Sequence, residues 1–389
     1  MNMLDVLPFP GNEEVLRLLP RLVRVLAGDG PPIVPVPLDS GAEQIGMIGP
    51  FFAGGAPLDP RVALIVATSG STGHPKGAML SADALAASAA ATRERLGGPG
   101  SWLLTLPAHH IAGLQVLLRG IADGTEPTVI DVRHGFDPAA LVTAIDRMGA
   151  GRRYTSLIPA QLRKVLDHPA AAAAAADLDA ILVGGGATSP DLVARALAAG
   201  LPIVRTYGMS ETAGGCVYDG VALPGVTIRI DEPDASGAGR IALSGPMLAL
   251  GYRNAPENEA FAESGWYRTD DLGALDGGVL RVLGRTDDAI GTGGLTVMPR
   301  VVEEAIDRID GVTESAVVGL PDERLGQRVA AMIALSPGFE ITAQAIGRTV
   351  ADTLGRFAAP RSVLFVDRLP RLASGKPDRL AIIAAFPSD

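Results

Sequence analysis

RVALIVATSGSTGHPKG, residues 61–77, joins the pattern of a buried strand to a loop suited to an anion. The first part, 61–67, is mostly apolar and holds β-branched Val62, Ile65 and Val66, which predicts a buried strand. The following hydroxyls, glycines and Lys76 form the segment Thr68–Gly77. Glycines let backbone N–H groups approach an anion, while hydroxyls and a lysine add hydrogen bonds and charge. We interpret this segment as a phosphate-binding loop.

The loop is not a Walker A motif, because Lys76 lies between Pro75 and Gly77 instead of preceding Ser or Thr. A flexible polar turn is the structural alternative for a loop of this composition. The strand before it and the Pro-Lys-Gly ending favour phosphate binding.

Composition narrows the class of protein. The 389 residues suffice for two or three domains, and the net charge of −10 argues against a general nucleic-acid binder. A single cysteine, Cys216, excludes an intramolecular disulfide and a cysteine-rich zinc site. The sequence has neither a signal-peptide pattern nor a long apolar run, so we expect a cytoplasmic protein without a membrane span.

Alternating patterns predict an α/β fold. Strand patterns at 102–106, 128–132, 181–183 and 203–206 alternate with helical patterns at 82–96, 139–148 and 190–199. Such alternation favours mostly parallel sheets with covering helices, and 227–243 predicts a β-hairpin. A short helix is expected at 258–263.

A second unit is expected after Gly284. Helical patterns at 299–309 and 342–354 accompany strand patterns at 315–319, 329–335 and 362–366. We therefore expect an N-terminal domain over 1–284 and a small mobile α+β domain over 285–389. The short polar joint between them suits a hinge near Asp287.

Three further segments carry groups that bind nucleotides. In Thr206–Thr212, Tyr207 can stack on a base, Ser210 can donate to a phosphate and Glu211 can hold Mg²⁺. Three glycines after a strand, at 184–186, suit a turn that admits a flat ligand, although taken alone they favour a plain tight turn. In 266–273, a carboxylate at a turn can accept both hydroxyls of a ribose.

Taken in order, these motifs resemble those of the adenylate-forming superfamily, which includes acyl-CoA synthetases, luciferases and adenylation domains. The resemblance implies ATP, Mg²⁺ and CoA as cofactors or cosubstrates, with Glu211 as the magnesium ligand. It implies catalytic roles for Lys376, Thr68, Lys76, Glu211 and His110. It implies cofactor binding by Ser69, Gly70, Ser71, Thr72, Gly73, Gly184, Gly185, Gly186, Thr206, Tyr207, Gly208, Ser210, Asp271, Arg285, Gly293 and Gly294.

Within that assignment, Lys376 would bridge the carboxylate and the α-phosphate, and Asp271 would bind the ribose. Gly293 and Gly294 would meet the pantetheine of CoA. The sequence departs from the family pattern at Asp270, where glycine is usual, and also at Gly291, Val301 and Leu372.

A narrower resemblance concerns the acid. Only 67 residues precede Thr68, and segments 106–115, with His110, and 155–162, with Gln161, resemble the o-succinylbenzoate–CoA ligase branch of menaquinone biosynthesis. Arg205, Gln115 or nearby hydroxyls are candidates to hold the second carboxylate of that acid. A ligase for another aryl or fatty acid, an adenylation enzyme that loads a carrier protein, and a non-catalytic relative remain alternatives. A homodimer is compatible with the resemblance.

Overall fold

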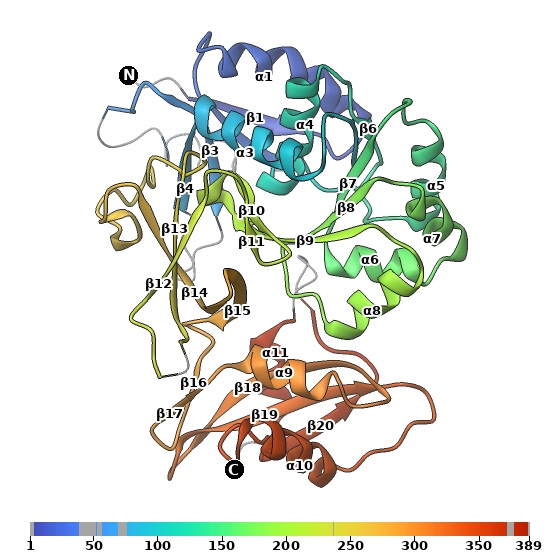
Figure 1. Ribbon diagram of the computed structural model, residues 1–389, viewed down its shortest axis with the longest axis vertical. Helices are drawn as coiled ribbons and strands as arrows, with labels where there is room; N and C mark the ends of the chain where they lie inside the picture. The colour runs from blue at the N-terminus through green and yellow to red at the C-terminus, as the bar shows by residue number, and fades with distance from the viewer. Residues whose placement is uncertain are drawn as a thin grey trace.

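The computed structural model describes residues 4–38, 52, 57–68, 76–235, 237–371 and 377–387. Ser69, Gly70, Ser71, Thr72 and Gly73 of the phosphate loop, and also Lys376 and Leu372, lie outside these ranges. The described residues form four sheets, three in the upper part of the molecule and one below, in orange and red (Figure 1). The predicted α/β class is confirmed.

The first sheet contains the strand that precedes the phosphate loop. Its order is β1 (Asp5–Phe9), β2 (Ile33–Pro37), β3 (Val62–Thr68) and β4 (Lys76–Ser81). The strand expected at 61–67 is confirmed and extends to Thr68. Thr68 pairs with Lys76 across antiparallel β3 and β4, so our assignment of Lys76 and Gly77 to the loop was wrong. This pairing sets Thr68 and Lys76 side by side.

The second sheet is parallel through most of its width. From one edge it runs β11 (Val221–Ala222), β10 (Gly214–Tyr218), β9 (Ile203–Met209), β8 (Ala180–Val183), β7 (Arg153–Leu157), β5 (Ser101–Leu104) and β6 (Thr128–Val129). Strands β9 to β6 are parallel, and β10 and β11 are antiparallel.

Helices cover both faces of this sheet. One face packs against α3 (Ala82–Arg95) and α4 (Ile111–Asp123), with α1 (Leu19–Leu26) and the 3-10 helix η1 (Glu13–Leu18) beyond. The other packs against α5 (Pro138–Asp146), α6 (Pro159–Leu166), α7 (Pro169–Ala176) and α8 (Pro190–Ala198). Leu103 and Ile181 point into one core while Leu104 and Leu182 point into the other, as strand alternation requires.

The third sheet is entirely antiparallel. It consists of β12 (Thr227–Asp231), β13 (Gly239–Ser244), β14 (Trp266–Asp276) and β15 (Val279–Arg285), which confirms the hairpin at 227–243. Two expectations were wrong here. Asp270 and Asp271 lie inside β14, not at a turn, because β13 and β15 pair with it on both sides. The helix expected at 258–263 is only a short 3-10 helix, η3 (Glu259–Phe261).

The fourth sheet belongs to the lower unit. It is built from β16 (Ile290–Thr292), β17 (Leu295–Val297), β18 (Val312–Asp322), β19 (Gly326–Leu335) and β20 (Ser362–Val366), with helices α9 (Pro299–Ile306), α10 (Ala343–Leu354) and α11 (Arg379–Ala385). Its two faces carry separate cores, one under α9 and α10 and one under α11. None of the helices in the described ranges is long and apolar enough to cross a membrane.

Candidate functional site

The candidate site lies where the parallel strands of the second sheet end. Strand β8 ends at Val183 and β9 at Met209, and these neighbours are parallel, so the segments after them share one edge of the sheet. Ligands of open α/β sheets bind at this carboxyl edge. The fold therefore brings Gly184–Gly186 and Tyr207–Glu211 together.

Close packing explains two of the glycines. A side chain on Gly184 would overlap the hydroxyl of Thr206, which itself donates to the carbonyl of Val183 at 3.4 Å. A side chain on Gly208 would overlap the carbonyl of Gly214 on β10. Packing within the protein thus requires both glycines, Gly184 because of a neighbouring side chain and Gly208 because of neighbouring backbone, whatever they contact in a ligand.

The turn after β9 presents Glu211. Residues Ser210–Thr212 form the 3-10 helix η2, and the Thr212 hydroxyl accepts the N–H of Met209 at 2.9 Å. Thr212, and not Ser210, therefore fastens this turn. Glu211 is only 6% exposed.

Glu211 is held by an aromatic residue that sequence reasoning missed. The hydroxyl of Tyr252 donates to Glu211 Oε1 at 2.7 Å, and Lys76 Nζ lies 5.1 Å from the Tyr252 ring centroid. Burial raises the pKa of Glu211, while the Tyr252 hydrogen bond and the Lys76 charge oppose that rise. Lys76 and Glu211 are far apart in sequence, and both thus contact the side chain of Tyr252.

The position of Tyr252 follows from backbone pairing. Tyr252 bridges to Ala78 of β4, and Met79 donates its N–H to the carbonyl of Gly251 at 3.0 Å. Asn254 Oδ1 accepts the N–H of Gly77 at 3.0 Å. The segment 251–254 therefore braces the strand that carries Lys76, a long-range pairing with no local signal in the sequence.

Glu211 also satisfies the chemistry of a magnesium site. No group of three or more His, Cys, Asp or Glu side chains that could hold a metal occurs among the described residues. Mg²⁺ is normally bound through one or two carboxylates together with substrate phosphates. A single desolvated carboxylate beside a lysine matches that pattern, because the carboxylate can bind the cation and the lysine can attract the phosphates.

A second tyrosine holds Asp271. The Tyr207 hydroxyl donates to Asp271 Oδ2 at 2.7 Å. Burial raises the pKa of Asp271, and the Tyr207 hydrogen bond and the Arg285 charge counter that rise. We expected Tyr207 to offer its ring to a base, and its hydroxyl has this further use.

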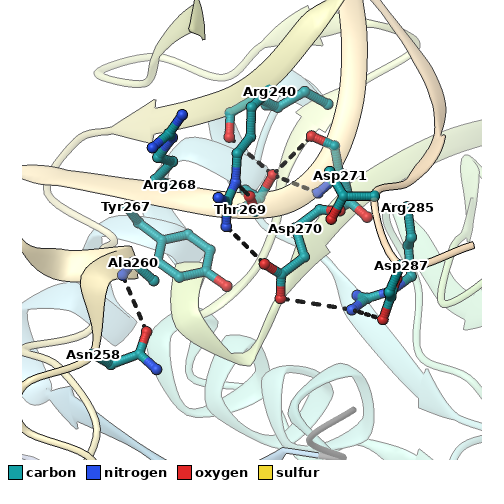
Figure 2. A network of polar contacts seen from close by, with 12 residues as sticks. Arg240, Asn258, Ala260, Tyr267, Arg268, Thr269, Asp270, Asp271, Arg285 and Asp287 are labelled. Carbon is teal, nitrogen blue, oxygen red and sulfur yellow. Dashed lines mark hydrogen bonds and ion pairs between the residues drawn. The ribbon is translucent and has the colours of Figure 1, made fainter. Parts of the chain in front are cut away.

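Arg285 closes the network at the end of β15 (Figure 2). Its Nε and Nη2 atoms donate to the two carboxylate oxygens of Asp287 at 2.8 and 3.0 Å. The same Nη2 lies 3.6 Å from Asp270 Oδ2, and Asp270 Oδ1 accepts from Arg240 Nη2 at 2.7 Å. Arg240, like Tyr252, was not singled out in the sequence.

The expected acyl-side residues have structural partners. His110 precedes α4 and lies against His109, with ring centroids 4.1 Å apart, and desolvation lowers its pKa. The Gln161 amide joins α6 to Thr105, donating to the Thr105 carbonyl at 2.8 Å and accepting the Ile158 N–H at 3.0 Å. Gln161 thus fixes the backbone at Thr105 and Ile158.

The two candidates for the acid's second carboxylate differ. Gln115 is buried and donates to the Ala213 carbonyl at 2.6 Å, which leaves its oxygen, an acceptor, without a partner. That oxygen cannot bind a carboxylate. Arg205 is exposed and lies 3.5 Å from Asp219.

Gly293 and Gly294 are not brought to the nucleotide residues. They form the two-residue turn between β16 and β17, both with positive φ, which is the turn that favours glycine in a tight hairpin. Gly293 lies beside Leu325 and Phe357 of the lower unit.

Comparison with known proteins finds family matches in both parts of the chain. Residues 32–253 match the AMP-binding enzyme family model, and residues 301–376 match the AMP-binding enzyme C-terminal domain. A probable 2-succinylbenzoate–CoA ligase of Mycobacterium tuberculosis is 51% identical over 97% of both chains. A feruloyl-CoA synthase of an Amycolatopsis species is 32% identical over 92% of this chain and 73% of its own.

A solved structure agrees with these relatives. The o-succinylbenzoate–CoA synthetase of Bacillus subtilis, in complex with its acyl-adenylate intermediate, superposes with a TM-score of 0.71 at 26% identity. The match covers 95% of this chain and 81% of that one.

Proposed function

This chain belongs to the AMP-binding enzyme family, and from that premise we propose that it is an AMP-forming ligase of o-succinylbenzoate and CoA. Its product would be o-succinylbenzoyl-CoA, an intermediate of menaquinone biosynthesis. The observation that carries the proposal is the near full-length similarity to the M. tuberculosis ligase. Two carboxylates support it, because they suit a magnesium–nucleotide complex: Glu211, which is buried after β9, and Asp271 of β14, which Tyr207 holds.

The first half-reaction would form the acyl-adenylate. A carboxylate oxygen of the acid attacks the α-phosphorus of ATP, and the bond to the bridging oxygen breaks to release pyrophosphate. Lys76, the loop that follows Thr68, and Lys376 would offset the charge that develops on the phosphates. No enzyme nucleophile is required, since the acyl-adenylate is itself activated.

The nucleotide would be oriented by groups that are already fixed. Asp271, held by Tyr207, can accept the ribose hydroxyls, and Arg285 carries positive charge beside it. Glu211 would hold Mg²⁺, which supplies charge neutralisation on the phosphates when it is bound. Because Tyr252 fixes Glu211 before any ligand arrives, little rearrangement would be needed.

The second half-reaction would use a different arrangement. The thiolate of CoA attacks the acyl carbon and AMP leaves with the electron pair of the broken bond. We propose that the lower unit turns about Asp287, removes Lys376 from the site and brings Gly293–Gly294 to the pantetheine. Gly293 and Gly294 lie in the β-turn between β16 and β17 of the lower unit, so they would move with that unit.

Lys376 gives this division of labour a direct test. Lysine occurs only at positions 76, 164 and 376 of an arginine-rich chain. Lys376→Ala should lower acid-dependent pyrophosphate exchange about 1000-fold, since one transition-state charge contact is removed. Thioester formation from supplied acyl-AMP should change less than about threefold. Lys164→Ala is the matched control, and equal loss in both half-reactions would contradict the proposal.

The acid itself is tested with a panel. Pyrophosphate release would be measured with o-succinylbenzoate, benzoate, ferulate and a medium-chain fatty acid, each with and without CoA. We expect kcat/KM for o-succinylbenzoate to exceed the others at least about 100-fold. The other acids lack the second carboxylate, so they would leave the protein group that binds it without a partner, which is costly. A higher kcat/KM for another acid would identify that acid as the substrate in place of o-succinylbenzoate. Pyrophosphate release without any CoA thioester would favour a carrier protein as the acyl acceptor. No release with any acid would indicate a non-catalytic relative.

A further inference from the structure

Asp270 stands where the family pattern has glycine, and its carboxylate lies between two arginines (Figure 2). Arg240 Nη2 donates to Oδ1 at 2.7 Å, and Arg285 Nη2 lies 3.6 Å from Oδ2. Arg240 comes from β13 and Arg285 from β15, the two strands that flank β14. Asp270 therefore links three strands through one side chain.

The backbone of Asp270 is tied to the joint between the two units. Its carbonyl accepts both the N–H of Thr286, at 2.8 Å, and the Thr286 hydroxyl, at 3.1 Å. Its neighbour Asp271 pairs in register with Arg285 across β14 and β15. The pairing of β14 with β15 thus holds Asp271, the expected ribose ligand, next to Asp270. It also holds Thr286, the first residue of the joint, against the Asp270 carbonyl.

Arg285 has two kinds of partner here. Asp287, which grips both Nε and Nη2, lies beyond the end of β15 in the joint itself. Asp270 lies inside β14 and stays with the sheet. A bidentate pair depends on its geometry, so a change in the backbone angles of Asp287 would break the first contact without disturbing the second.

We propose that Asp270 is a positioning residue that keeps Arg285 on the nucleotide after the joint at Asp287 has turned. The inference rests on the proposed function, since it needs two half-reactions separated by that turn. In the first half-reaction Asp287 alone suffices to orient Arg285. In the second, Asp270 takes over. Glycine at this position would remove the β14 carboxylate that lies 3.6 Å from Arg285 Nη2, and would leave on that strand Asp271, which already accepts from Tyr207.

The two half-reactions separate this role from a purely structural one. Acid-dependent pyrophosphate exchange reports adenylation, and CoA consumption from chemically prepared acyl-AMP reports thioester formation. Asp270→Asn and Asp270→Gly should lower kcat/KM of the thioester step about five- to tenfold, and should change adenylation less than twofold. Asp270→Glu should recover most of the loss, because it restores a carboxylate within reach of Arg285.

Asp276→Asn is the matched control, since it neutralises an exposed carboxylate on the same strand. It should leave both half-reactions within about twofold of wild type. Equal losses in both half-reactions, or no loss in either, would overturn the role of Asp270. If o-succinylbenzoate were not the substrate, the wild type would fail in the acid panel, and the same comparison would be made with the acid it accepts.

Discussion

Two groups of carboxylates lie within one site and are held in opposite ways. Glu211 and Asp271 are largely buried, and each accepts one hydrogen bond from a tyrosine hydroxyl, at 2.7 Å in both cases. Asp270 and Asp287 have side chains 47% and 42% exposed, and they pair with arginine. A buried acceptor that loses its donor costs about 1–3 kcal/mol, whereas an exposed ion pair contributes about 0–1 kcal/mol.

The difference separates fixed from exchangeable contacts. The tyrosine-held carboxylates are fixed before a ligand binds, which suits the residues expected to hold Mg²⁺ and the ribose. The arginine pairs cost little to break, which suits a joint that turns. Substitutions should therefore have large effects in the first group and small effects in the second.

Among these carboxylates, the largest effect is expected at Glu211. Glu211→Gln keeps the size of the side chain and removes the charge that would hold Mg²⁺, so kcat/KM for magnesium–ATP should fall about 100-fold. Steady-state rates across a magnesium titration measure the change. Glu257→Gln, an exposed site, is the control, and a loss below about threefold at Glu211 would break the comparison.

Asp307 extends the comparison to the lower unit. Ser315 Oγ donates to Asp307 Oδ1 at 2.6 Å, and burial raises the pKa of Asp307 to about 7, with the Ser315 hydrogen bond and the Arg163 charge acting against the rise. Glu303 and Glu304 add to the rise. The folded chain therefore binds more protons than the unfolded chain between about pH 4 and pH 7.

The stabilising contribution of Asp307 is complete below about pH 4 and is lost as pH rises through about 7. Asp307→Asn should remove this dependence and be more stable than wild type at pH 8 by about 1–4 kcal/mol. Chemical unfolding of the lower unit from pH 4 to pH 8 measures it, with exposed Asp352→Asn as the control. Parallel curves for Asp307→Asn and wild type would contradict the prediction.

A smaller effect is expected at Tyr207. Tyr207→Phe leaves Asp271 without its donor, so KM for ATP should rise about five- to tenfold with little change in kcat. Tyr218→Phe removes another buried hydroxyl, which lies 3.0 Å from Thr92 Oγ1. It should lower stability without changing KM, and an equal rise in KM for both variants would show that the Tyr207 effect is not local.

The smallest effect is expected at Asp288, whose carboxylate lies 3.4 Å from Arg379 Nε at the joint. Asp288→Asn should change kcat by less than twofold, because the pair is part-exposed and worth about 1 kcal/mol or less. Steady-state kinetics with both substrates saturating decide the point. A tenfold loss would mean that the joint is held as rigidly as the buried carboxylates.

The sequence predicts the parts of this site that depend on local pattern. Residues close together in the chain predict strand β3 and the hairpin at 227–243. They also predict the motifs that carry Gly184, Glu211 and Asp271. The side chains that contact these residues cannot be predicted from local sequence. Tyr252 contacts Glu211 because its backbone pairs with Ala78 of β4, and no local sequence pattern predicts that pairing.

The same reason explains the error at Asp270 and Asp271. Two adjacent aspartates after aromatic residues favour a turn by local preference. Asp271 nevertheless pairs with Arg285 of β15, and the Asp270 carbonyl accepts the N–H of Thr286, so both lie in β14. Tertiary pairing overrides propensity, and the carboxylate of Asp270 acquires two arginine partners that no pattern in the sequence indicates.

The central claim is that one chain forms an acyl-adenylate and then discharges it to CoA. It is tested most directly by mixing the enzyme with α-phosphate-labelled ATP, Mg²⁺ and o-succinylbenzoate without CoA, quenching, and then repeating with a CoA chase. Labelled o-succinylbenzoyl-AMP should accumulate in the first mixture, and the chase should convert it to AMP and o-succinylbenzoyl-CoA. Labelled ADP in place of the adenylate, or an adenylate that CoA does not discharge, would contradict the account.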